Sequence, residues 1–120
     1  YAYTNIIANP GGENDIIMFK SCYPLSEVGS SINDEKNIYN SLKTYVAAHP
    51  NKLFVLIAPP GETTVSSYPL TRELCNLLVD RQNGWLNDYA GKNVFVFDFY
   101  AVLSETNSHH RWMNGEVEYV

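Results

Sequence analysis

Two places in the sequence put residues that could do chemistry directly after an apolar run. Ser21 and Cys22, followed by Tyr23, come after the apolar run 15–20, and Asp98 lies at the end of another such run. A small side chain or a backbone N–H group at such a position can face a developing oxyanion, and a carboxylate can orient the loops of a site. The structural alternatives are a turn serine with a core cysteine, and a buried carboxylate held by hydrogen bonds.

A third group of polar residues lies near the end of the sequence. His109, His110 and Arg111 are followed by Trp112, and one of the two imidazoles could contact a ligand. Neighbouring residues of a strand point to opposite faces, so the two histidines are poorly placed to share a metal ion, and we expect no metal site. The alternative is that both imidazoles are solvated.

Two further patterns argue against other kinds of site. Residues Gly12 to Asp15 spell G-x-N-D, a motif that matters in one hydrolase family, but they precede an apolar run and so lie at the wrong end of the predicted sheet. We expect them to form a turn. No Gly-rich phosphate loop follows any apolar run, which gives a nucleotide site no support, and we expect no cofactor.

The composition is that of one globular domain. The 120 residues are 45% hydrophobic and carry a net charge of −5 without a basic cluster, which argues against a nucleic-acid partner. No apolar run approaches the roughly 20 residues of a membrane span. Cys22 and Cys75 have no metal-type spacing, and two free thiols are favoured over a disulfide.

Three apolar runs predict strands over residues 15–20, 53–58 and 93–100. The middle run, LFVLIA, is unbroken and lies between Pro50 and Pro59, which is typical of a strand that is buried on both faces. We therefore expect this run to be the centre of a parallel sheet.

Two helices are predicted between the strands. The first should be capped by Ser31, and its apolar stripe consists of Ile38, Tyr39, Leu42, Tyr45 and Val46. The second has Pro69 in its opening turn, continues through Leu86 and stops at Gly91. Gly84 falls inside this pattern and should weaken the second helix by about 1 kcal/mol relative to Ala.

The order strand–helix–strand–helix–strand predicts a single, partial α/β domain with a parallel sheet. Residues 1–14 would form a loop, residues 15–103 the core and residues 104–120 a polar tail. Because crossovers are right-handed, both helices should lie on one face of the sheet and leave the opposite apolar face uncovered. We expect that face to meet missing parts of the same domain or a second copy of the chain.

The segments DIIMFKSCYP, KLFVLIAPPG and NVFVFDFYAVL, in this order, resemble the middle of an SGNH/GDSL-type hydrolase. The loop NSHHRWMNG resembles the loop that follows the third of these strands in one subgroup of the family. The family has a flavodoxin-like α/β/α sandwich. The resemblance therefore implies a partial flavodoxin-like, three-layer arrangement over roughly residues 15–115.

The resemblance also implies what this chain would and would not supply. The nucleophilic serine block and the Asp-x-x-His block of the family match nothing in residues 1–120, and Lys20, Ser21 and Cys22 replace the oxyanion-hole asparagine. A parent enzyme would be a serine ester hydrolase acting on a small-molecule ester or an acylated carbohydrate, with a secreted or cell-surface location. The chain alone would be inactive.

Two other functions stay open at this point. The first alternative is a non-catalytic binding or structural module that keeps the fold. The second is a flavodoxin-like cofactor binder.

Overall fold

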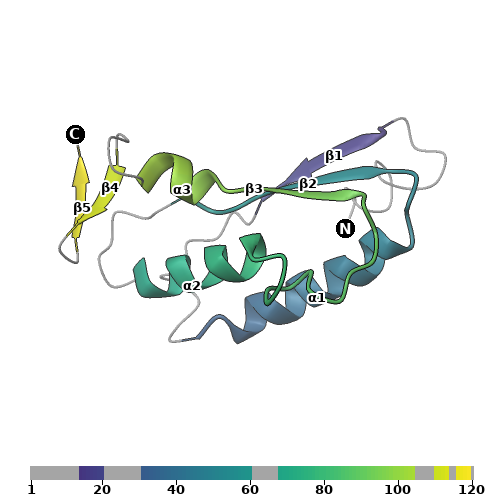
Figure 1. Ribbon diagram of the computed structural model, residues 1–120, viewed down its shortest axis with the longest axis horizontal. Coiled ribbons are helices and arrows are strands. Elements are labelled where there is room, and N and C mark those ends of the chain that lie inside the picture. Colours follow the sequence, from purple (N-terminus) through teal and green to yellow (C-terminus); the bar gives the residue numbers. More distant parts are fainter. Residues whose placement is uncertain (1–13, 21–30, 61–67, 105–109, 114–115, 120) are drawn as a thin grey trace.

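The computed structural model describes residues 14–20, 31–60, 68–104, 110–113 and 116–119 (Figure 1). The elements in chain order are β1 (Ile16–Phe19), α1 (Asn33–Ala47), β2 (Leu53–Ile57), α2 (Tyr68–Val79), β3 (Val94–Phe97), α3 (Phe99–Ser104), β4 (His110–Met113) and β5 (Glu116–Tyr119).

The first three strands form one parallel sheet in the order β1-β2-β3. In one of the two rows that face the helices, Ile17 pairs with Phe54, and Phe54 pairs with Val94. The predicted α/β class is confirmed: parallel strands alternate with helices in a partial flavodoxin-like arrangement. The strand predicted over residues 53–58 is indeed the middle one.

The core lies between this sheet and a single layer made of α1 and α2, which run along the same side of the sheet in Figure 1. Leu56 from β2 is completely buried and belongs to the same cluster as Leu74 and Leu78 of α2. Tyr39 of α1 meets Trp85 edge to face, with ring centres 5.5 Å apart. Aromatic pairs in this geometry stabilise a core beyond the area they bury.

The opposite side of the sheet is apolar and uncovered by the described helices. Side chains alternate along each strand, so every second residue faces away from the helical layer. We call this surface the open face; it consists of Ile16, Met18, Leu53, Val55, Ile57, Phe95 and Phe97. Five of these side chains are classed as exposed, and Val55 and Ile57 are half-buried. The prediction of one uncovered face is therefore confirmed for the described part of the chain.

The first helix differs from its prediction in which residues it buries. Ile38 was expected in the apolar stripe, but its side chain is 59% exposed, while Glu35 is buried. The backbone N–H of Asn33 donates to Ser31 Oγ at 3.2 Å, yet the residue at the N-cap position is Ile32, which makes no side-chain cap. The helix thus begins two residues after the predicted cap.

The second helix is shorter than predicted and ends at Val79. Asp80 Oδ1 accepts the backbone N–H groups of Gln82 and Asn83 at 2.8 and 3.0 Å, which offers the chain a turn in place of another helical turn. Trp85 is buried from this turn, and its Nε1 donates to the carbonyl of Leu78 at 3.2 Å. The prediction that the second helix continues through residues 85 and 86 was wrong, although both side chains are buried in the core.

The chain after β3 also differs from the prediction. The third strand ends at Phe97, and residues predicted as strand form α3 instead. Within the expected polar tail, β4 and β5 pair antiparallel, with Met113 opposite Glu116. This register leaves two residues between the strands, Asn114-Gly115 in sequence, and Asn-Gly flanked by strand residues is the strongest short-range hairpin signal. This hairpin is not among the elements predicted from the sequence.

Gly84 gives a test of the turn that replaces the predicted helix. A Cβ at this position would lie 2.1 Å from the carbonyl oxygen of Leu77 and 2.2 Å from that of Asp80, both of them backbone atoms. We expect Gly84→Ala to lower the free energy of unfolding in urea by at least about 2 kcal/mol.

If residue 84 lay inside a helix, the same substitution would instead raise the free energy of unfolding by about 1 kcal/mol. Gly91→Ala is the matched control, because the three atoms nearest to its Cβ would belong to the side chain of Tyr89 and not to the backbone. Its cost should be the smaller of the two.

Candidate functional site

The carboxyl edge of the sheet is the part of the fold where a ligand is expected. Ala58 and Pro59 follow β2 there, and Asp98 follows β3. Because each helix starts where the preceding strand has ended, the first turns of α1, α2 and α3 also belong to this edge. Side chains from five elements can therefore meet at one place.

Cys75 is at the centre of this edge as a buried free thiol. It forms a cluster with Ala58 and Tyr100, and its Sγ donates to the carbonyl of Pro59 at 3.5 Å. Burial and the charge of Asp98 together raise the pKa of Cys75 to about 12, against the opposing effect of the Arg72 charge. A thiol with such a pKa stays protonated at neutral pH and is a poor nucleophile.

Arg72 and Tyr100 form the polar rim next to this thiol. The Arg72 guanidinium carbon lies 4.4 Å from the centre of the Tyr100 ring, which is a cation–π contact. Burial raises the pKa of Tyr100, and the Arg72 charge opposes that shift. Tyr100 is almost completely buried while Arg72 is exposed, so the contact leaves a positive charge at the surface of the edge.

Asp98 is half-buried and has a structural partner. Its Oδ1 accepts the backbone N–H of Ala101 at 3.0 Å, which caps the first turn of α3. The hydrogen-bonded alternative considered for this residue is therefore present. Its charge also acts on Cys75, so Asp98 lies at the expected edge and fixes the direction in which α3 leaves it.

Glu35 is a buried residue at this edge that is not among the site residues predicted from the sequence. Only 8% of its surface is exposed, and its Oε2 has no hydrogen-bond partner among the described residues. Burial is the main cause that raises the pKa of Tyr39 to about 12, and the charges of Cys75 and Glu35 add to it. In sequence, Glu35 is one of two acidic residues in a first helical turn, a pattern already explained by the helix dipole. Nothing in that pattern distinguished it from exposed Asp34.

The remaining predicted site residues are placed only in part. Ser21, Cys22, Tyr23 and His109 lie outside the described residues. His110 and Arg111 begin β4, where their backbones pair with Tyr119 and Glu118, and β4 packs beside α3. The fold therefore connects Asp98 to the histidine segment through one short helix.

A hollow of about 540 Å³ lies at the opposite, amino edge of the sheet, where Asn93 precedes β3. The Asn93 amide donates to the carbonyls of Val46 and His49 at 3.2 and 3.0 Å and accepts the hydroxyl of Tyr89. These bonds join the end of α1 to the start of β3. The polar groups of Asn93 are thus already engaged, and the hollow lies at the edge where ligands of parallel sheets do not bind.

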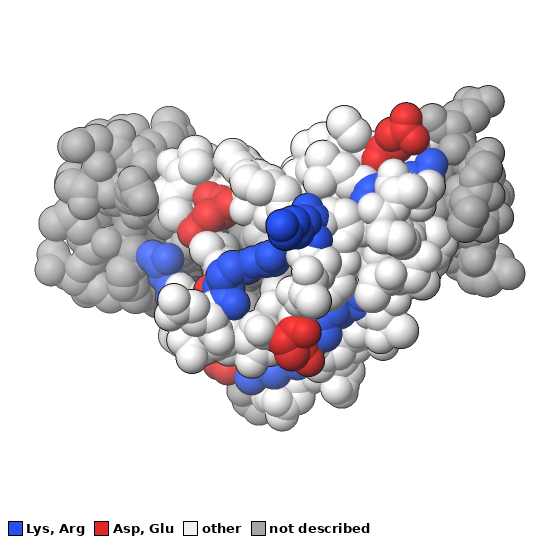
Figure 2. All heavy atoms as spheres, turned by 45° about the vertical axis from the view of Figure 1, so that its right-hand side comes forward, with Lys and Arg blue, Asp and Glu red and all other residues white. Residues whose placement is uncertain are grey.

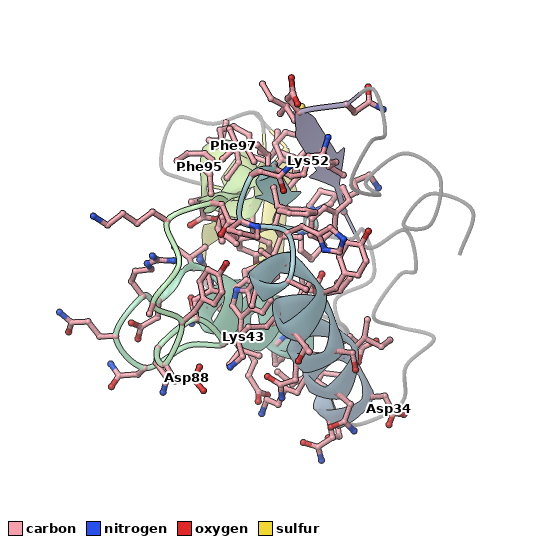
Figure 3. The ribbon with its side chains drawn as sticks, turned by 90° about the vertical axis from the view of Figure 1, so that its right-hand side faces the viewer. Asp34, Lys43, Lys52, Asp88, Phe95 and Phe97 are labelled. Carbon is pink, nitrogen blue, oxygen red and sulfur yellow. The ribbon has the colours of Figure 1, made fainter. Side chains whose placement is uncertain are left out.

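Two ion pairs join α1 to α2 and to the connection before β3, and Figure 2 shows basic and acidic residues distributed over one face of the molecule. Lys36 lies 3.3 Å from Glu73 on α2, and Lys43 lies 2.5 Å from Asp88 in the connection to β3. Figure 3 shows the second pair at the outer surface of the helices. A hydrogen bond from Lys43 lowers the pKa of Asp88, but both pairs are too exposed to add much stability.

Two further findings concern the described residues as a set. They contain no group of three or more His, Cys, Asp and Glu side chains that could hold a metal ion. None of their helices is long and apolar enough to cross a membrane.

Glu35 and Asp34 should respond oppositely to the same substitution. Replacing the buried carboxylate by Leu removes an acceptor without a described partner, so Glu35→Leu should raise the free energy of unfolding by about 1–3 kcal/mol. Asp34→Leu removes only an exposed charge from the first helical turn and should lower it by about 0.3–1 kcal/mol. Urea unfolding at neutral pH measures both. A loss of stability in Glu35→Leu would show that Glu35 has a stabilising partner.

Cys75 and Tyr39 should make the fold less stable in alkaline solution. Their pKa values are raised to about 12 from ordinary values of 9.0 and 10.0. A group with a raised pKa contributes stability below its ordinary value, and this stability is lost as the pH rises toward the folded-state value. The free energy of unfolding should therefore fall between about pH 9 and pH 12.

Urea unfolding at a series of pH values measures this fall. Cys75→Ala should remove the part that begins near pH 9, and Tyr39→Phe the part that begins near pH 10. An unchanged pH profile in Cys75→Ala would contradict the assignment.

Comparison with known proteins finds no matching family model, no matching curated protein and no matching solved structure.

Proposed function

We propose that this chain is the central part of an SGNH-hydrolase-like domain and supplies the middle of its sheet and one wall of its site. The parent protein would hydrolyse an ester, on a small molecule or an acylated carbohydrate. A serine hydroxyl from outside residues 1–120 would attack the ester carbonyl and release the alcohol, and water would then release the acid.

One observation carries the proposal. The three segments that resemble the family form neighbouring parallel strands in the order β1-β2-β3, with their carboxyl ends at one edge. The resemblance requires this topology, since its site lies at that edge. An antiparallel pair or a different strand order would have been incompatible with it.

The described residues suggest how this chain would take part. Asp98 would position α3 and the segment that leads to His109 and His110, because it caps the first turn of that helix. Arg72 would hold a positive charge beside the site, where a developing oxyanion is favoured. Ser21, Cys22 and Tyr23, which lie outside the described residues, would form the rim after β1. The open face would contact other parts of the parent domain.

A second candidate function is a non-catalytic binding or structural module of the same fold. The observation in its favour is that Cys75, Tyr39 and Tyr100 all have pKa values shifted toward the protonated form. Activated nucleophiles show the opposite shift. A parent sequence that lacks both a serine after its first strand and an Asp-x-x-His block would favour this module.

A short-chain aryl ester such as p-nitrophenyl acetate tests the proposal. The 120-residue chain should release p-nitrophenol no faster than buffer does, because it would lack the nucleophile and its base. A longer product of the same gene should hydrolyse the ester, and replacing its upstream serine by alanine should abolish that activity.

Ser21→Ala and Cys22→Ser in the 120-residue chain are the controls. Sustained turnover by the wild-type chain that either variant loses would place the nucleophile inside this sequence and overturn the proposal. A longer gene product that folds and carries both blocks but hydrolyses none of a panel of aryl and sugar acetates would also overturn it.

A further inference from the structure

The open face is a large apolar surface for so small a chain. Its exposed members are Ile16 at 60%, Met18 at 55%, Leu53 at 38%, Phe95 at 56% and Phe97 at 40%. A fully exposed side chain of this size presents roughly 200 Å², so the face presents about 500 Å². This lies in the upper part of the range for the largest apolar patch of a soluble monomer, and such patches often mark interaction sites.

The described elements of the chain leave this face open. Helices α1 and α2 lie on the other side of the sheet, and Figure 3 shows Phe95 and Phe97 on the side that faces away from them. The β4–β5 hairpin lies beyond α3, past the carboxyl edge (Figure 1). Parallel sheets are normally covered on both faces, so the exposed rows need an occupant from elsewhere.

We propose that in the 120-residue chain this occupant is a second copy, bound face to face about a two-fold axis. All seven residues of the open face are apolar, so the face meets its own copy without like-charge repulsion, as a two-fold interface requires. Two such faces present about 1,000 Å² together, which is the lower limit for a specific interface between proteins. Two sheets packed this way lie about 10 Å apart.

The arrangement of side chains across the face selects the direction of the axis. Met18, Val55 and Phe95 form one row across the three strands. A two-fold axis that runs along β2 places β1 of one copy over β3 of the other. The row of Met18, Val55 and Phe95 then lies over the same row of the second copy. Met18 then meets the partner's Phe95, a flexible thioether against a phenyl ring, which is a favourable contact. An axis across the strands would instead place the Phe95 ring of one copy against the Phe95 ring of the other.

Sedimentation equilibrium of the 120-residue chain tests the dimer. The wild-type chain should be a dimer at micromolar concentration, and Phe95→Asp and Met18→Lys should each weaken association at least tenfold. Both side chains are exposed in the single copy, so circular dichroism should show that the variants stay folded. Ile38→Asp is the matched control, because Ile38 is equally exposed at 59% but lies on α1. It should leave the dimer unchanged.

The double variant Met18→Lys/Phe95→Asp tests the axis. With β1 over the partner's β3, each new lysine meets a new aspartate, and association should recover relative to either single variant. With β1 over β1, like charges meet, so a lack of recovery would overturn the proposed axis.

A wild-type chain that is folded and monomeric would overturn the proposal. So would a dimer that survives both single substitutions, open-ended aggregates, or an equal effect of Ile38→Asp. These outcomes are independent of the ester assay, because association is measured without substrate and on the 120-residue chain alone.

Discussion

The packing of one helical layer against the centre of the sheet is the interaction on which the rest of the structure depends. Leu56 is completely buried because β2 has a strand on each side and the helical layer below it. The side chains that surround it come from α1, α2 and the turn after α2. Removing any of these partners would expose the same few side chains, so sheet and helices form one cooperative unit.

This dependence explains which predictions from the sequence succeeded. The run around Leu56 is long, unbroken and bounded by prolines, and tertiary packing reinforces what the pattern already favours. The order of elements, the parallel sheet and the uncovered face follow from it together with the handedness of crossovers. The ends of the elements were harder to predict because local side chains decide them. Asp80 ends α2 by offering the backbone a turn, and Asp98 starts α3 in the same way.

The candidate site was less predictable than the fold for a related reason. The carboxyl edge could be identified in advance, and Asp98 does lie there, because strand ends follow from strand positions. Glu35, Arg72 and Tyr100 reach the same edge from helices, and the apolar periodicity of a helix says little about how its first turn meets a neighbouring element. Trp85 is a similar case in the core. Its side chain is buried, but it lies in a turn that the apolar periodicity had predicted as helix.

Asn93 affects where local unfolding of the protein can begin. Carbonyl groups in the last turn of a helix have no partner in the helix itself, and the ends of helices therefore often fray. Here one amide side chain occupies the carbonyls of Val46 and His49 while its own backbone carbonyl accepts the N–H of Phe54 in β2. The last turn of α1 is thereby fastened to two strands at once. It should open only when the strands themselves separate, so this helix end belongs to the most slowly exchanging part of the molecule and not to its periphery.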